Sequence, residues 1–152
     1  MATVETVLGP VDASRLGVTL SHEHVLVGMG QDNHHYPWRF DWEATRANAI
    51  RELSEARAGG VSTIIDLTTP DLGRDVSFVR DVAQASGMQV VVATGIWRDV
   101  PRSFWERDHD TIADIFVREI EVGIGRTNIK AGAIKVANDM GGVTAEGERI
   151  LR

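Results

Sequence analysis

The sequence predicts an α/β fold in which short parallel strands alternate with helices. Runs rich in β-branched residues recur four times, a helical pattern follows each run, and Gly or Pro separates the segments. Strands that alternate with helices of about 10–15 residues form parallel sheets with right-handed crossovers. A complete (β/α)8 barrel takes about 250 residues, whereas this chain has 152. We therefore expect the first four β-α units of a TIM-type barrel, in a single domain over residues 1–152.

A short β-hairpin is expected before these units, because Gly9 and Pro10 separate two strand-like runs. The β-α units then cover about residues 17–152. The expected elements, in chain order, are a hairpin at about 3–15, a strand at 17–24, a long loop at 25–40, a helix capped by Asp41 and ended by Gly59 and Gly60, a strand at 62–68, a helix at 75–86 ended by Gly87, a strand at 89–94, a helix at 110–122 capped by Asp110, a strand at 131–137, and a last helix starting at Thr144.

Apolar residues spaced three or four positions apart predict the helices. The three apolar stripes are Trp42, Ala49, Ile50, Leu53 and Ala56; Val76, Val79, Val82 and Ala83; and Ile112, Ile115, Phe116 and Ile120. The strand at 89–94 is nearly all apolar, as a strand covered on both faces should be. An open doubly wound sheet begins with the same alternation, but it usually carries a Gly-rich phosphate-binding turn after its first strand. His22, Glu23 and His24 occupy that place here, which favours the barrel.

Composition limits the classes of function. The chain has 22 Asp and Glu against 16 Lys and Arg, a net charge of −6, so nucleic acid or an anionic membrane is not expected as a partner. It contains no cysteine, which excludes a disulfide, a thiolate zinc site and a thiol nucleophile. No run approaches the ~18 apolar residues of a membrane span, and the N-terminus does not resemble a secretory signal. The cytoplasm is the expected location.

His22 and His24 are the first candidates for chemistry. They lie two residues apart at the C-terminal end of the expected first strand, where alternation points both imidazoles to the same side. Both could then bind one metal ion, and this end of a barrel strand is the active-site face. A pair with this spacing also arises by chance in roughly one sequence in six at this histidine content, so its position carries the argument. The other histidines are expected to be solvated or structural: His34, His35 and His109.

Lys135 is the second candidate. It lies in the short apolar strand at 131–137, on the face opposite Ile134 and Val136. Lysine is rarely buried without a partner, and desolvation disfavours its charged form and leaves a neutral amine that can react. The alternative is a lysine near a strand end whose ammonium reaches solvent.

Three further candidates follow the ends of expected strands. Asp66 could accept a hydrogen bond from a metal-bound histidine, or it could brace the next turn through Thr68 and Thr69. Trp97 and Arg98 follow the third strand. The indole could form an aromatic wall for a ligand, or it could pack in the core.

Six short segments occur in order along nearly the whole chain. They are residues 20–24 (LSHEH), 58–66 (AGGVSTIID), 71–75 (DLGRD), 93–97 (ATGIW), 116–120 (FVREI) and 132–137 (GAIKVA). Each is weak alone, but together and at these separations they resemble the phosphotriesterase family of the amidohydrolase superfamily, the metal-dependent (β/α)8 hydrolases. The resemblance implies a hydrolase acting on ester bonds of a small molecule, either an aryl phosphotriester (an aryldialkylphosphatase) or a lactone.

The resemblance also implies a site with two divalent metal ions. His22 and His24 would bind the more buried ion, and Lys135, carboxylated by CO2, would bridge both ions through its carbamate. Zinc is the expected metal. Cobalt and manganese are alternatives, because histidine and carbamate suit all three ions. A hydroxide shared by the two ions would attack phosphorus or a carbonyl carbon. Trp97 matches the aromatic side of the leaving-group pocket.

The chain departs from the family pattern in two respects. Phosphotriesterases tend to have a second aromatic residue after that tryptophan, and the lactonases carry tyrosines in this region, whereas this chain has Arg98. Phosphotriester and lactone therefore both remain open as substrates. The family also takes two further metal-binding histidines from strands five and six and an aspartate from strand eight. All would lie beyond Arg152, so His22, His24 and Lys135 make up half of the ligand set.

Two hypotheses about function remain. In the first, the chain is the N-terminal half of a binuclear metal-dependent hydrolase, truncated or completed by another chain. In the second, it is a non-catalytic half-barrel, a fragment or an assembly module. A half-barrel leaves strand edges unpaired, so a homodimer or a complementing half-barrel is expected. Two copies of this chain would duplicate the three ligands rather than supply the missing ones.

Overall fold

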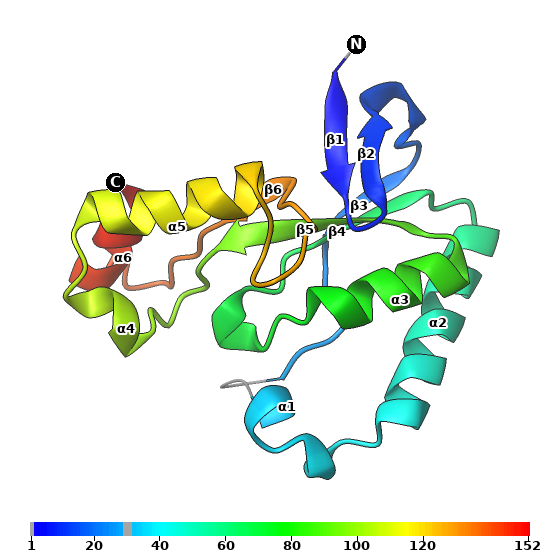
Figure 1. Cartoon of the computed structure of the whole chain (residues 1–152), viewed down its shortest axis with the longest axis horizontal. Coiled ribbons are helices and arrows are strands. Elements are labelled where there is room, and N and C mark those ends of the chain that lie inside the picture. The colour runs from blue at the N-terminus through cyan, green and yellow to red at the C-terminus, as the bar shows by residue number, and fades with distance from the viewer. Residues whose placement is uncertain (1, 29–31) are drawn as a thin grey trace.

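The computed structural model describes residues 2–28 and 32–152. Within these ranges the strands form an antiparallel pair, β1-β2, and a parallel sheet in the order β3-β4-β5-β6. The sheet curls as one half of a barrel and the strand pair precedes it, which confirms the predicted fold class (Figure 1). The strands are β1 Thr3–Thr6, β2 Gly9–Asp12, β3 Thr19–Glu23, β4 Thr63–Asp66, β5 Gln89–Gly95 and β6 Ala133–Lys135. The α-helices are α1 Asp32–His35, α2 Trp42–Ala58, α3 Val76–Ser86, α4 Arg102–Trp105, α5 His109–Glu121 and α6 Ala145–Leu151.

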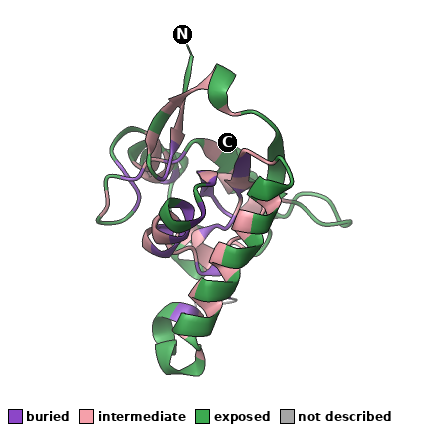
Figure 2. Ribbon diagram, turned by 90° about the vertical axis from the view of Figure 1, so that its right-hand side faces the viewer, coloured by how far each residue is buried: buried purple, intermediate pink, exposed green. Residues whose placement is uncertain are grey.

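Helices α2 and α3 cover one face of the parallel sheet (Figure 1). The core beneath them joins Ile64 of β4, Val90 and Val92 of β5, and Val79 and Ala83 of α3. The predicted stripes of both helices pack partly into this core and partly into a second cluster between α2, α3 and Leu26. Buried residues gather at the centre of the molecule (Figure 2). None of the helices within the described ranges is long and apolar enough to cross a membrane.

Strand β3 turns its histidines to the uncovered face because of an irregular register. Leu20 pairs with Ile64 and Glu23 pairs with Asp66, so β3 holds one residue more than β4 over this stretch, as in a β-bulge. Ile64 and Asp66 lie two residues apart and therefore share a face of β4. Their partners in β3 share that face too, and His22, next to Glu23, points to the other one. Since Ile64 packs against the helices, His22 faces the open side.

Strand β6 brings Lys135 to the same open face from the other edge. Lys135 pairs with Gly95, the last residue of β5. The neighbouring Thr94 donates a hydrogen bond to Glu119 of α5, on the helix-covered side. Because side chains alternate along a strand, Gly95 and its partner Lys135 face away from the helices.

The N-terminal strand pair closes the other end of the sheet. The backbone N–H of Val7 donates to the carbonyl oxygen of Val90 at 2.9 Å, and the Val7 side chain is buried in the main core. Val90 lies near the start of β5, whereas Gly95 is the last residue of β5 and pairs with Lys135, the last residue of β6. The hairpin and the candidate site therefore occupy opposite ends of the strands.

The expected long loop at residues 25–40 is wrong in part. The segment contains α1 and a 3-10 helix at Pro37–Arg39, while its residues 29–31 lie outside the described part of the chain. A tertiary contact stabilises α1, because the buried Asn33 donates from Nδ2 to the carbonyl oxygen of Gly73 at 2.8 Å. A contact across 40 residues leaves no periodic pattern in the sequence.

The expected cap of α5 is also wrong. The helix begins at His109, and the cap is Asp108, whose carboxylate accepts from the N–H of Thr111. Asp110 lies in the first turn instead, where a negative charge suits the helix dipole. The predicted cap at Asp41 and the predicted helix end at Gly87 are confirmed. Thr144, where the last helix was expected to start, is the residue that caps α6.

Candidate active site

His22 and His24 lie at the centre of the candidate site. Their ring centroids are 5.5 Å apart, with an interplanar angle of 66°, so both imidazoles point to the same side, as strand alternation predicted. His22 belongs to β3, and His24 follows the strand directly. Nζ of Lys135 lies 3.5 Å from Nε2 of His22. The structure therefore brings together the three residues that the sequence predicted as ligands.

Lys135 is partly exposed rather than fully buried. The reason is the open face of the half-barrel, which no further strands cover within the described ranges. Its amine nevertheless lies against the imidazole of His22. Lys135 is therefore both partly exposed and in contact with a predicted ligand.

The donor set fits part of a metal centre. Over residues 2–28 and 32–152, histidines, aspartates and glutamates do not gather in a group of three or more that could hold a metal ion. The open face offers two imidazoles and one amine. Imidazole nitrogen is a regular ligand of zinc, but a zinc site takes three or four protein ligands. The three residues therefore fit a metal ion chemically and leave part of its coordination to other groups.

Asp66 braces the turn after β4 and also connects to His24. Its side chain is buried, and Oδ1 accepts from the N–H and the hydroxyl of Thr68 at 2.8 and 2.5 Å. Oδ2 accepts from the N–H of Val25 at 3.3 Å. Nδ1 of His24 lies 2.9 Å from Oγ1 of Thr68, so Thr68 links the carboxylate to the imidazole. The expected bracing through Thr69 does not occur, because Oγ1 of Thr69 has no hydrogen-bond partner in the described part of the chain.

Burial shifts the pKa values of the two titratable groups in this network, Asp66 and His24. Desolvation raises the pKa of Asp66 above its ordinary value of 3.8, and the hydrogen bonds from Thr68 and Val25 oppose that shift. Desolvation also lowers the pKa of His24 below 6.5; the charge of Asp66 opposes this shift, and the charges of His22 and Lys135 add to it. His24 therefore stays neutral to lower pH than a free histidine does, and neutral imidazole is the form that binds metals.

Trp97 and Arg98 follow β5, as expected. The guanidinium of Arg98 lies 4.7 Å from the centroid of the indole of Trp97, which is within the range of a cation–π contact. Arg98 also donates from Nη1 to Asp139, beyond β6, at 2.7 Å. It thereby ties together the segments that follow β5 and β6, and it lines a cavity of about 370 Å³ there.

The buried ion pair between Arg74 and Glu119 was not predicted. The guanidinium donates to both carboxylate oxygens, at 2.9 and 2.5 Å, and also to the carbonyl oxygen of Ala93. Both residues lie in segments that carry the family resemblance, 71–75 and 116–120. Glu119 lies among other charged residues of α5, Arg118 and Glu121, so its charge alone did not identify it as the buried one.

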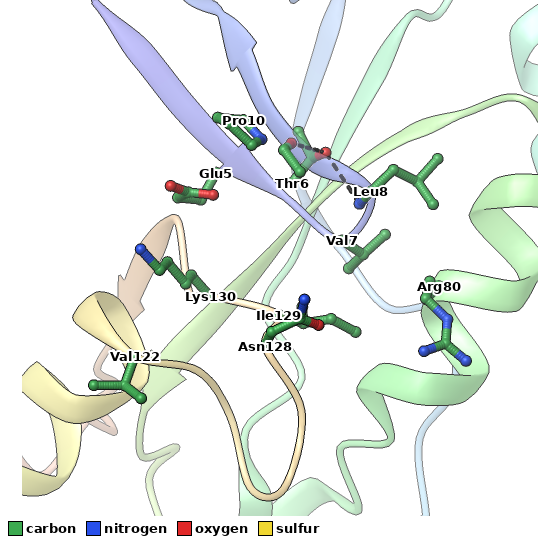
Figure 3. Close-up of a pocket in the computed structure, with 11 residues that line it drawn as sticks. Glu5, Thr6, Val7, Leu8, Pro10, Arg80, Val122, Asn128, Ile129 and Lys130 are labelled. Carbon is green, nitrogen blue, oxygen red and sulfur yellow. Dashed lines mark hydrogen bonds between the residues drawn. The ribbon is translucent and has the colours of Figure 1, made fainter.

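A second cavity lies at the hairpin end of the strands (Figure 3). It measures about 570 Å³ and lies between the β1-β2 turn, α3 and residues 128–130, with Glu5, Arg80 and Lys130 among its lining side chains. The predicted site residues do not line it. The candidate site therefore remains the open face at the C-terminal ends of the strands.

Comparison with known proteins agrees with the resemblance found in the sequence. The sequence profile of the phosphotriesterase family matches residues 2–152. The chain is 43% identical over 162 residues to a phosphotriesterase homology protein of Mycobacterium tuberculosis, an alignment that covers 100% of this chain and 50% of the relative. It is 37% identical over 144 residues to an aryldialkylphosphatase of Saccharolobus solfataricus, covering 93% of this chain and 46% of that one. It is 28% identical over 156 residues to a phospho-furanose lactonase of Mycoplasmopsis agalactiae, covering 95% and 42%.

The chain spans about half the length of these curated relatives. The match extends from the N-terminal hairpin to the last helix, and it includes the segments that hold His22, His24 and Lys135. The chain belongs to the phosphotriesterase family.

Proposed function

We propose that this chain forms the N-terminal half of a metal-dependent hydrolase that cleaves an aryl phosphotriester or a lactone. The observation that carries the proposal is the meeting of His22, His24 and Lys135 on the open face of the sheet. They lie at the C-terminal ends of the strands, where TIM barrels hold their active sites. Relatives named aryldialkylphosphatase and phospho-furanose lactonase support these two substrate classes. The proposed location is the cytoplasm.

Two divalent cations suit the donor set, with zinc as the first choice and cobalt or manganese as alternatives. His22 and His24 would hold one ion through imidazole nitrogens. Lys135 would contribute to both ions after its neutral amine adds to CO2 and loses a proton, which gives a carbamate. Bound ions of this kind lower the pKa of water and polarise a P=O or C=O bond. The remaining ligands would come from residues outside these 152.

The protein's own side chains would then orient the site and its substrate. Burial favours the neutral form of His24, and the amine of Lys135 is placed next to His22. Trp97 and Arg98 would border the substrate, with the guanidinium stacked on the indole.

The test is the substitution Lys135→Ala in the protein at its natural length. We expect loss of one of the two bound metal ions and of most hydrolysis of a chromogenic aryl phosphotriester or a γ-lactone, without loss of the fold. Metal content, hydrolysis rate and circular dichroism measure these effects. Lys130→Ala is the matched control, because Lys130 lines the cavity at the opposite end of the strands. Unchanged metal content and activity in Lys135→Ala would contradict the proposal. So would a wild-type protein that binds no metal and hydrolyses neither substrate.

The strand edges also require a partner under this proposal. The edges of β3 and β6 are unpaired within the described sheet. Ile134 and Val136, on the face of the β6 segment opposite Lys135, are 61% and 41% exposed. We propose that a second copy of the chain or a complementing half-barrel covers them. Sedimentation of the chain alone at increasing concentration distinguishes these two cases, because self-association would appear without any second protein.

A further inference from the structure

We infer that Thr68 and Asp66 hold His24 in the tautomer that carries its hydrogen on Nδ1, so that Nε2 presents a free lone pair to a metal ion. The inference rests on the proposed function in one respect, the role of His24 as a ligand. The tautomer itself can be measured in the metal-free protein. Thr68 and Asp66 are thus positioning residues, since they act through the imidazole.

The hydroxyl of Thr68 lies between two partners. Its Oγ1 is 2.9 Å from Nδ1 of His24 and 2.5 Å from Oδ1 of Asp66. A hydroxyl has one hydrogen to donate, although it can also accept. The partner that receives this hydrogen therefore decides which nitrogen of the imidazole carries its own.

Asp66 receives the hydrogen of Thr68. Its Oδ1 accepts from the backbone N–H of Thr68 at 2.8 Å, and its Oδ2 accepts from the N–H of Val25 at 3.3 Å. Both carboxylate oxygens therefore already act as acceptors, and Oδ1 also accepts from the hydroxyl of Thr68. The hydroxyl then presents a lone pair to His24, and Nδ1 must supply the N–H of that hydrogen bond.

Burial keeps this arrangement in place. Asp66 and Thr68 are each 2% exposed, so water has little access to replace either partner. An unmade hydrogen bond at a buried polar group is unfavourable, which disfavours the other tautomer of His24. The contact of Asp66 with Val25 adds a second restraint, because Val25 follows His24 directly in the chain.

The two histidines differ in this respect. In the described residues, the hydrogen-bond contact of the His22 ring is with the amine of Lys135, itself a predicted ligand. His24 instead has an outer partner that leaves its Nε2 free. Removal of such an outer partner typically weakens metal binding about 10–100-fold. We therefore expect Thr68 to affect metal affinity without touching the metal.

The first measurement is the tautomer of His24 in the wild-type protein at its natural length. Two-bond ¹H–¹⁵N NMR of the histidine rings, in the presence of a chelator and at a pH where the ring is neutral, separates the two tautomers. The variant His24→Gln identifies the signals of His24. We expect the hydrogen on Nδ1, and a hydrogen on Nε2 would overturn the inference. This measurement does not depend on the folding of a Thr68 variant.

The second measurement compares variants at two adjacent threonines. Thr68→Val removes the hydroxyl and keeps the shape, whereas Thr68→Ser keeps the hydroxyl. Thr69→Val is the matched control, since Thr69 is also buried and its Oγ1 has no partner among the described residues. For Thr68→Val we expect a mixture of tautomers and zinc affinity about 10–100-fold weaker by chelator competition, with both Thr68→Ser and Thr69→Val near the wild type.

The outcomes separate this inference from the proposed function. An unchanged tautomer and unchanged zinc affinity in Thr68→Val would overturn the inference. Loss of zinc affinity with Thr68→Ser as large as with Thr68→Val would also overturn it, because the hydroxyl would then not be the group that matters. A wild-type protein with the expected tautomer that binds no zinc would contradict the proposed function and leave the tautomer assignment intact.

Discussion

Arg74 and Glu119 form a two-point ion pair that joins the turn after β4 to helix α5. The guanidinium donates to both carboxylate oxygens, at 2.9 and 2.5 Å, and the side chains are only 6% and 14% exposed. The carbonyl of Ala93 and the hydroxyl of Thr94 complete their hydrogen bonds. Removal of one partner would leave the other charge in a medium of low dielectric constant, which is far costlier than removal of both.

Glu119→Gln is therefore expected to lower the free energy of unfolding by about 3 kcal/mol. The double variant Arg74→Met with Glu119→Leu should recover most of that loss, because it leaves no unpaired charge. Denaturant unfolding of the protein at its natural length measures both effects. Glu148→Gln, which removes the exposed pair with Arg152, is the control, and it should change stability much less. A Glu119→Gln loss no larger than that of the control would contradict this account.

Gly95→Ala should damage both stability and the candidate site. Gly95 has a φ of +99°, and a Cβ there would overlap the carbonyl oxygen of its strand partner Lys135. Gly60 has the same φ but open space around the added carbon, so Gly60→Ala isolates the backbone strain, about 1–2 kcal/mol. We expect a larger loss of stability for Gly95→Ala and weaker zinc binding in that variant alone. Equal effects of the two substitutions would show that the close approach to Lys135 is unimportant.

The free energy of unfolding of the metal-free protein should decrease as the pH is lowered, because of His24. Its pKa is lowered below 6.5 in the folded state. As pH drops below 6.5, the unfolded chain takes up a proton that the folded chain resists, so the free energy of unfolding decreases through the folded pKa. Above 6.5 both states are neutral, and His24 contributes no slope. Urea unfolding as a function of pH should therefore give a flatter acid limb for His24→Gln than for the wild type. His35→Gln, at an exposed position, serves as the control, and equal slopes for wild type and His24→Gln would refute the prediction.

The cap of α3 should contribute measurably to stability. Oδ1 of Asp75 accepts from the N–H groups of Ser77 and Phe78 at 3.1 and 3.0 Å. Asp75→Ala removes both bonds at the start of a largely buried helix, with an expected loss of about 1 kcal/mol. Asp75→Ser keeps an acceptor and should lose less. Thermal or urea unfolding would decide the point, and equal stability of the two variants would be the contrary result.

The periodic parts of the fold were predictable because local pattern and global packing agree. The stripe from Val76 to Ala83 is apolar at helical spacing, and its residues are buried against the sheet or against α2. The meeting of His22 with Lys135 was predictable for a related reason. Parallel strands end on the same side of the sheet, and the curl of a half-barrel brings the ends of its outer strands toward each other.

The other features of the structure could not be predicted, because they depend on contacts between segments that the pattern within one strand or helix does not reveal. The hydroxyl of Thr68 faces His24 only because the turn after β4 lies beside the end of β3. The partner of Arg74 lies 45 residues away, on a helix whose apolar stripe gives no indication of an ion. Asp108, rather than Asp110, caps α5, because the backbone is still extended at Asp108 and becomes helical at His109. Composition alone does not indicate where that change occurs.

The extra residue in β3 decides which face of the sheet the histidine pair uses. If β3 paired evenly with β4 from Leu20 onward, His22 would lie opposite Asp66 and would turn to the helix-covered face. The two histidines would then keep their spacing in the sequence and lose the open face. The irregular register is therefore as much a part of the candidate site as the histidines themselves.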